Sequence, residues 1–138
     1  MMDKKEILEF MNENSRAFLA TLEDGKPRVR AMGIYKMEER GIIIQTFKSK
    51  DVCKQLTENP EVEICFNNFE QGIQVRVRGK VEPYEDDAEK KESLEQRPFL
   101  KKFVDQGEEI ALFILKDGLA HIWNVDKNFD PKSFVKLS

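Results

Sequence analysis

Cysteine and histidine are scarce in this chain of 138 residues, which contains two cysteines and one histidine. Cys53 and Cys65 are too few for a disulfide framework, and their spacing matches no common zinc-binding pattern. His121 lies in an apolar segment without a cluster of Cys, His or carboxylate residues beside it, which favours a core or interface position over metal binding or catalysis. We therefore expect two buried, reduced thiols and no metal site.

Long apolar segments and an excess of one charge are also absent. The N-terminus, MMDKKEILEFMNEN, has charges where a secretory signal needs an apolar run, and no segment approaches the roughly 18 apolar residues of a membrane-spanning helix. The 23 basic and 26 acidic residues are mixed along the chain, with a net charge of −3, so charge alone recruits neither nucleic acid nor a membrane. These features predict a cytoplasmic protein whose anion-binding site, if it has one, is local.

Repeats and low-complexity segments are likewise missing, and a hydrophobic content of 40% in a chain of this length fits one continuous core. We expect a single domain spanning residues 1–138. Paired carboxylates, a Ser-His-Asp order and a Cys-His pair are not recognisable in the sequence. Hydrolysis and covalent catalysis therefore have no support and no catalytic side chain is assigned, so an enzyme of this kind would rely on a cofactor for the difficult step.

Alternating polarity predicts a mainly β protein with flanking helices. The strand-like segments are residues 17–23, 29–37, 42–47, 62–66, 72–82, 110–116 and 119–125. Asp24-Gly25 and Asp117-Gly118 supply tight turns, which predict a hairpin at each place and a meander of the first three strands. Six or seven strands with short connections favour an antiparallel, closed or partly closed barrel, because parallel strands need a crossover between each pair.

Three segments have helical spacing. Asp3 can cap a first helix that ends near Asn14 and covers one end of the sheet. Residues 49–59 predict a second helix, which the steric restriction before Pro60 ends. Residues 85–105 predict one or two surface helices. Their inward-facing residues are expected to be Leu94, Phe99, Leu100 and Phe103.

Arginines alternate with apolar residues on two of the predicted strands and therefore share a face on each. The polar residues concerned are Arg28 and Arg30 on one strand and Gln74, Arg76 and Arg78 on the other. If the two strands are neighbours, they present an arginine cluster whose forked donors match phosphate or carboxylate oxygens. The alternative is an exposed sheet face on which these arginines pair with acidic residues. The candidate acidic partners are Glu61, Glu63 and Glu82.

The segment Thr46-Phe47-Lys48-Ser49-Lys50 joins a strand to the start of a helix. Free backbone N–H groups and the helix dipole favour an anion there, and Thr46, Ser49 and Lys50 add hydroxyl donors and a charge. The glycines of a nucleotide-phosphate loop are missing. The alternative is that Ser49 is only the N-cap of the helix.

Trp123 is the only tryptophan of the chain. A side chain of this size usually lies in a core or a dimer interface, but its flat ring and N–H also suit the edge of a bound heterocycle.

Taken in order, three segments resemble the pyridoxamine 5′-phosphate oxidase-like flavoproteins. They read FLATLEDGKPRVRAMG (18–33), GIIIQTFKSKDVCKQLTENPEVEICF (41–66) and QVRVRGKVEPYEDD (74–87). The resemblance covers roughly the whole chain and is greatest to short bacterial members that are nitroimidazole-reductase-like. It implies a split β-barrel that forms a homodimer, with two FMN sites between the subunits.

The resemblance also implies which residues contact FMN. The strand that lines the flavin contains Arg28, Val29, Arg30, Ala31 and Met32, and the flavin-contacting end of the next strand contains Gln45 and Thr46. The phosphate-binding helix start contains Ser49 and Lys50. Gln74 falls on the glutamine of the family's R-Q-V strand, and Trp123 falls near the second subunit's contact with the ring. In this assignment Arg28, Thr46, Ser49 and Lys50 hold the phosphate. Gln74 bonds the polar edge of the ring.

Departures from the family pattern narrow the expected chemistry. Pyridoxamine phosphate oxidases end in an arginine- and histidine-rich segment that holds the substrate phosphate, whereas this chain ends NVDKNFDPKSFVKLS. The family's lysine at the end of the PRVR-like strand is Gly33 here, and the proline usual in the short members is Ala31. Oxidation of vitamin B6 is therefore not expected.

Two classes of function remain. The first is an FMN-dependent oxidoreductase that uses a small-molecule electron donor and a nitroaromatic or quinone acceptor. The second is a non-catalytic binding or sensing protein of the same fold that holds flavin, haem or a deazaflavin, because a fold alone does not select a function. A cofactor-free dimeric scaffold is a further alternative.

Overall fold

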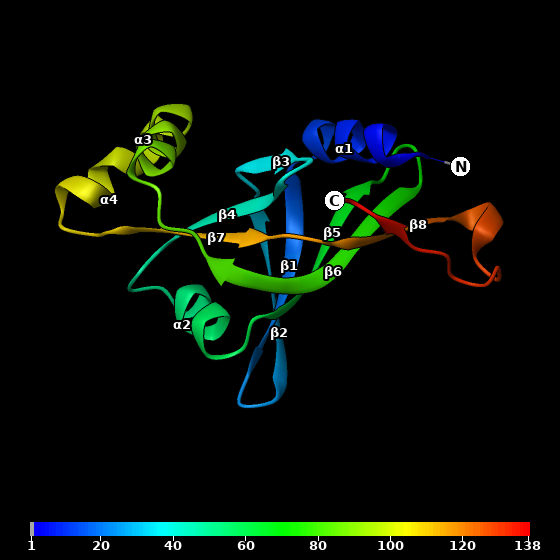
Figure 1. Cartoon of the computed structure of the whole chain (residues 1–138), viewed down its shortest axis with the longest axis horizontal. Coiled ribbons are helices and arrows are strands. Elements are labelled where there is room, and N and C mark those ends of the chain that lie inside the picture. Colours follow the sequence, from blue (N-terminus) through cyan, green and yellow to red (C-terminus); the bar gives the residue numbers. More distant parts are fainter. Residues whose placement is uncertain (1) are drawn as a thin grey trace.

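The computed structural model describes residues 2–138, and it is mainly antiparallel β structure with helices around it (Figure 1). The strands are β1 (Arg16–Glu23), β2 (Lys26–Gly33), β3 (Lys36–Glu38), β4 (Gly41–Phe47), β5 (Glu61–Asn68), β6 (Ile73–Pro83), β7 (Ile110–Leu115), β8 (Leu119–Asn124) and β9 (Val135–Lys136). The helices are α1 (Lys4–Glu13), α2 (Asp51–Glu58), α3 (Asp87–Gln96) and α4 (Lys101–Asp105), with short 3-10 helices at Pro98–Leu100 and Val125–Lys127.

The sheet has the order β2-β1-β5-β6-β7-β4-β3, and β8 pairs with both β6 and β9. All pairings are antiparallel, and the sheet is not closed. The predicted mainly β, antiparallel, partly open architecture is thus confirmed. The described chain has nine strands rather than six or seven, because β3 and β9 are too short to produce an alternating pattern.

The hairpin predicted at residues 110–125 is wrong. Strand β7 does not pair with β8, and instead both pair with β6, through Val81–Pro83 and Ile73–Arg78 respectively. The eleven residues of β6 are long enough to serve both partners in succession. Gly118 lies at the connection, where a Cβ atom would come within 2.7 Å of the Val77 side chain, so only glycine fits.

The predicted strand at residues 29–37 and the meander with its neighbours are also wrong. Strand β2 ends at Gly33, and β4 pairs with β3 and β7 rather than with β2. The consecutive residues Ile34 and Tyr35 are both buried, in two separate apolar clusters. Neither residue takes part in a strand pairing, because the β1–β2 ladder ends at Gly33 and the β3–β4 ladder starts at Lys36, so the chain leaves the sheet here.

The main core fills the space inside the curved sheet, and α1 and α2 cover its ends. Asp3 caps α1 as predicted, because its carboxylate accepts the Glu6 N–H at 2.9 Å while the Glu6 side chain accepts the Asp3 N–H. Helix α2 ends at Glu58, as Pro60 predicts. Cys53 is buried and Cys65 is half-buried, and neither forms a disulfide.

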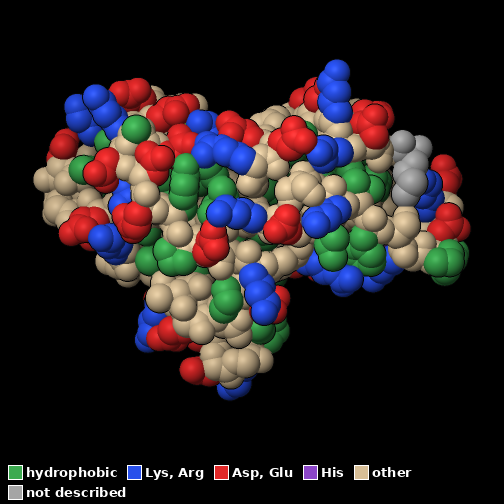
Figure 2. Space-filling model, in the orientation of Figure 1, with side chains coloured by type: hydrophobic (Ala, Val, Ile, Leu, Met, Phe, Trp, Pro, Cys, Tyr) green, Lys and Arg blue, Asp and Glu red, His purple; other side chains and the backbone are tan. Residues whose placement is uncertain are grey.

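Residues 87–105, which comprise α3, a 3-10 turn and α4, project from the sheet as an arm (Figure 1). Figure 2 shows this arm as one lobe of the surface and the β1–β2 hairpin with α2 as another. Three hollows lined by residues of the arm, β2 and the start of α2 form a recess between the two lobes. Phe99, predicted to face inward, is 69% exposed. Pro98 starts a new turn there, which places Phe99 on the side of the arm that faces the recess.

Within residues 2–138 no helix is long and apolar enough to span a membrane. The same part of the chain contains no group of three or more His, Cys, Asp or Glu side chains placed to bind a metal ion.

Candidate functional site

The recess consists of three adjoining hollows along β2 and the arm. The basic pocket, about 580 Å³, is lined by Glu23, Arg28, Val29, Arg30, Ser49, Lys50, Asp51, Val52 and Gln55. The arm pocket, about 500 Å³, is lined by Ser15, Arg16, Ala31, Met32, Gly33, Arg97, Phe99 and Leu100. The side pocket, about 360 Å³, shares Ser49 and Lys50 with the first and Leu100 with the second. Because of these shared walls we treat the three as one groove.

Two arginines of β2 line the basic pocket, and they differ in how firmly the chain holds their side chains. Arg30 is held in place, since its guanidinium donates to the Thr21 hydroxyl at 2.8 Å and to the Gln55 side chain at 2.6 Å. Burial lowers the pKa of Arg30. Arg28 is exposed and lies 3.2 Å from a Glu23 carboxylate oxygen. A charge-bearing ligand therefore meets one fixed and one movable guanidinium.

Helix α2 begins at this pocket without a side-chain cap. Lys50 is the N-cap residue, in extended conformation, and its side chain forms no hydrogen bond or ion pair with residues 2–138. Lysine is a poor N-cap, so the first N–H groups of α2 remain available to an acceptor in the pocket. The N-cap alternative for Ser49 is wrong, because its hydroxyl donates to the Glu108 carboxylate instead.

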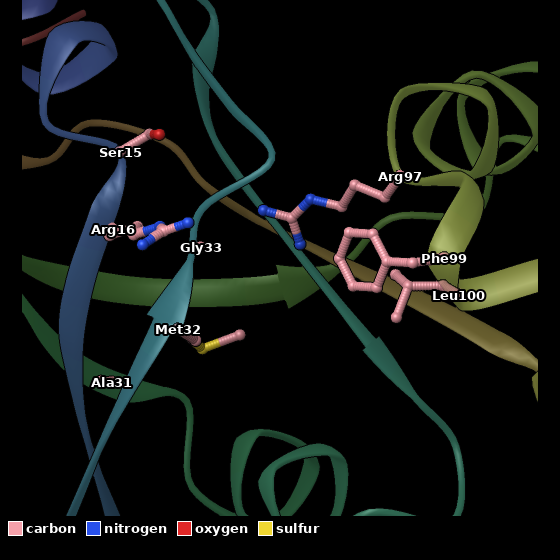
Figure 3. Close-up of a pocket in the computed structure, with 8 residues that line it drawn as sticks. All are labelled: Ser15, Arg16, Ala31, Met32, Gly33, Arg97, Phe99 and Leu100. Carbon is pink, nitrogen blue, oxygen red and sulfur yellow. The ribbon is translucent and has the colours of Figure 1, made fainter.

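The arm pocket contains an arginine that the sequence analysis missed. Figure 3 shows Arg97 reaching from the arm toward Gly33 on β2, with Arg16 on the opposite side. A Cβ atom on Gly33 would lie 2.6 Å from the Arg97 guanidinium, so the absence of a side chain there makes room for it. Burial lowers the pKa of Arg97, and its side-chain hydrogen bond goes to the Gln45 carbonyl oxygen at 3.3 Å. No carboxylate in the described chain pairs with it.

The only sequence signal for Arg97 was weak. It is the only arginine between residues 85 and 109, in a segment rich in Glu and Lys, and it stands immediately before Pro98. Nothing in that pattern indicates that the helix ends there and turns the guanidinium back toward β2.

A buried carboxylate fixes the arm to the sheet. Glu89 on α3 accepts from the Tyr35 hydroxyl at 3.0 Å and from the Lys36 ammonium at 3.1 Å, and it also pairs with Arg40. Burial alone would raise the pKa of Glu89, but the hydrogen bonds from Arg40, Lys36 and Tyr35 lower it to about 2. Burial and the hydrogen bond to Glu89 raise the pKa of Tyr35 to about 12.

Gln45 and Thr46 lie on opposite faces of β4. The Gln45 amide donates to the Ser93 hydroxyl at 2.7 Å and accepts from Arg97, so it supports the arm pocket from behind. Thr46 is buried, and its hydroxyl has no hydrogen-bond partner within residues 2–138. It does not line any of the three hollows.

Gln74 and Trp123 are not brought to the groove of their own chain. They pair directly across β6 and β8, and the Trp123 indole N–H donates to Asn128 at 3.0 Å. Strands β1 and β5 separate β6 from β2, so the prediction that the two arginine-bearing strands are neighbours is wrong. Arg76 lies 4.0 Å from Glu63, and Arg78 stacks on Phe134 instead.

Gln74 and Trp123 belong to a surface that we call the outer face, formed by the outward side chains of β2, β1, β5, β6 and β8. Phe18 lies on it directly between Ala31 and Cys65 in the strand register. Its exposed large apolar residues are Phe18 (41%), Val29 (69%) and Leu119 (37%). Apolar exposure of this kind on one face of a sheet is typical of an interaction surface.

Residues 3–123 match the family described as pyridoxamine 5′-phosphate oxidase. The chain belongs to this family. A NimC/NimA family protein from Clostridium acetobutylicum is 30% identical over 96% of this chain and 91% of its own, with a TM-score of 0.77. None of the curated proteins matches the sequence.

More distant structures share the fold. A protein of the pyridoxinephosphate oxidase family from Clostridium acetobutylicum, related to general stress protein 26, is 18% identical over 98% of this chain and 96% of its own, with a TM-score of 0.73. A heme binding protein from Mycobacterium smegmatis is 14% identical over 99% of this chain and 59% of its own, with a TM-score of 0.72. The same fold therefore also occurs in a heme binding protein.

Proposed function

We propose that the protein binds FMN in the groove and acts as an FMN-dependent oxidoreductase. The observation that carries this proposal is the uncapped start of α2, with Lys50, Arg28 and Arg30 around it. Backbone N–H groups at a helix start and nearby cations together form an anion site. A phosphate there satisfies donors that the described chain leaves without an acceptor.

The rest of the groove fits the flavin ring. The arm pocket adjoins the basic pocket along consecutive residues of β2 and has the apolar walls Met32, Phe99 and Leu100. Its volume, about 500 Å³, lies in the usual range for pockets that bind small molecules. The ring would thus lie against the 31–33 backbone, with Arg97 at its far end.

Bound FMN would supply hydride transfer at its N5 atom between a small-molecule donor and an acceptor such as a nitroaromatic or a quinone. The chain's own residues would bind and orient FMN and exclude water from it. Arg97 is the group that would meet an acceptor's negatively polarised oxygen, because it has no competing carboxylate. No side chain in the groove is assigned as a general acid or base.

The proposal includes a homodimer formed through the outer face. Gln74 and Trp123 lie on that face, away from the groove of their own chain. A partner subunit packed there would bring its own copies of these side chains toward the groove. The exposed apolar residues Phe18 and Val29 would then be covered.

Haem is the second candidate, because a heme binding protein shares the fold. A histidine axial ligand would have to be His121, the only histidine. Its side chain lines a separate hollow of about 180 Å³ beside Asp130 and Ser133. The groove itself offers no histidine, so its chemistry supports FMN better.

Replacing Lys50 with alanine is expected to weaken FMN binding by about 1.5–3 kcal/mol, the scale of a hydrogen bond to a charged group. Titration of the cofactor-free protein, followed by flavin fluorescence, measures this change. Lys54→Ala is the matched control, since Lys54 is exposed on the same helix and does not line the pocket. Equal FMN affinity in the two variants would remove Lys50 from the site.

A further inference from the structure

The side pocket differs in chemistry from the rest of the groove. Phe47, Leu100 and Phe103 form its apolar walls, and the Phe47 and Phe103 rings meet edge to face with centroids 5.8 Å apart. Its rim carries the acceptors Glu108 and Gln106. FMN placed with its phosphate in the basic pocket and its ring in the arm pocket does not need this space.

The walls of the side pocket are held in place by contacts between two loops. Lys48 forms an ion pair with Glu109 at 2.9 Å, and the Lys48 N–H donates to the Glu109 carbonyl at 2.9 Å. The Ser49 hydroxyl donates to Glu108 one residue earlier. These contacts fix the loop before β7 against the loop before α2. The hollow is therefore formed without a ligand.

The position of Lys50 decides what the side pocket can bind. Its side chain lines both the side pocket and the basic pocket and has no partner in residues 2–138. A ligand with a flat ring a short distance from a phosphate can thus place the ring against Phe103 and the phosphate beside Lys50. Glu108 can accept hydrogen bonds from amino or hydroxyl groups of that ligand.

We propose that the side pocket binds the adenosine diphosphate group of a dinucleotide. Adenine lies between Leu100 and Phe103, its amino group or ribose hydroxyls donate to Glu108, and a phosphate lies beside Lys50. A volume of about 360 Å³ accommodates one bicyclic base. Two kinds of dinucleotide contain this group. One is FAD, which would bind in place of FMN, and the other is NADH or NADPH, which would serve as the electron donor. The choice between them rests on the proposed function, whereas the adenosine diphosphate site does not.

The test compares ADP with inorganic pyrophosphate by calorimetric titration of the purified protein. ADP is expected to bind at least tenfold more tightly, because base stacking on an aromatic side chain typically contributes about that much or more. Phe103→Leu keeps an apolar wall but removes the flat ring, so it is expected to reduce the preference for ADP at least fivefold with pyrophosphate affinity unchanged. Phe69→Leu, at an aromatic residue that is 86% exposed and outside the groove, is expected to change neither.

Equal affinity of wild type for ADP and pyrophosphate would overturn the proposal, as would a Phe103→Leu variant that keeps the full preference. Direct titration with the whole dinucleotides identifies the one that binds. FAD that binds at least tenfold more tightly than FMN assigns the pocket to FAD, and NADH or NADPH that binds to the FMN-loaded protein assigns it to the pyridine dinucleotide. Failure of FMN itself to bind would contradict the proposed function and leave the ADP comparison valid.

Discussion

Replacing Glu89 with glutamine is expected to lower the free energy of unfolding by about 2–4 kcal/mol. The Glu89 side chain is 7% exposed and faces Lys36 and Arg40, which are 19% and 42% exposed. Glutamine keeps one acceptor oxygen but removes the charge, so Lys36 and Arg40 lose their buried anionic partner and keep only the more exposed carboxylates Glu38 and Glu92. This loss of stability is at or below the range usual for a broken buried ion pair, because the side chains of Lys36 and Arg40 are both partly exposed to water.

Urea denaturation at pH 7 measures this loss, and Glu92→Gln provides the control. Glu92 also pairs with Lys36, at 3.2 Å, but its side chain is 45% exposed. Exposed ion pairs typically contribute less than about 1 kcal/mol. If the two variants lose equal stability, the buried position of Glu89 has no special role in fixing the arm.

A comparison of wild type with Glu89→Gln at different pH values tests the lowered pKa of Glu89. Its folded-state pKa of about 2 lies below the value near 4.3 of an unperturbed glutamate. The ionised carboxylate therefore stabilises the fold above about pH 4.3, and this contribution is lost as the pH falls toward 2. The stability difference between wild type and Glu89→Gln should shrink over that window. A difference that is constant from pH 6 to pH 2.5 would contradict the ion-pair account.

Phe18→Asp is expected to convert the protein from a dimer to a monomer and to abolish FMN retention in the same step. A charge buried on the outer face in place of the exposed Phe18 ring would weaken dimerisation by about 3 kcal/mol or more, roughly a hundredfold. Phe18 lines none of the three hollows of its own chain. A loss of FMN therefore reports the partner subunit's contribution to the site.

Light scattering at micromolar concentration, with and without FMN, measures both effects. Phe69→Asp is the matched control, because Phe69 is more exposed but lies in the turn between β5 and β6. A wild-type monomer in the presence of FMN would contradict the dimer. A monomeric Phe18→Asp variant that binds FMN normally would show that the groove of one chain is sufficient.

Local features of the fold could be predicted because each depends on neighbouring residues. Asp3 defined the start of α1, and Pro60 defined the end of α2. The pairing of β6 with both β7 and β8 could not be predicted, since it depends on the close approach of Gly118 to Val77, which is distant in sequence. The Asp117-Gly118 turn looks the same whether or not its two strands pair.

In the candidate site too, features set by neighbouring residues could be predicted, whereas features set by residues distant in sequence could not. Arg28 to Met32 and Ser49 to Lys50 lie along one groove, as the resemblance implied they would lie near one ligand. Arg97 was missed because its position depends on the arm's attachment through Glu89 and Ser93. Thr46 lies inside the core because β4 alternates its side chains, and only one of Gln45 and Thr46 can face the arm.

The affinity of the wild-type protein for FMN compared with riboflavin tests the central claim most directly. Riboflavin lacks the phosphate, so contacts of Arg28, Lys50 and the α2 start predict that FMN binds at least about a hundredfold more tightly. This preference should shrink in Arg28→Ala, whereas Gln74→Ala should weaken both ligands by a similar factor. Equal affinity of wild type for riboflavin and FMN would contradict a phosphate site at the start of α2.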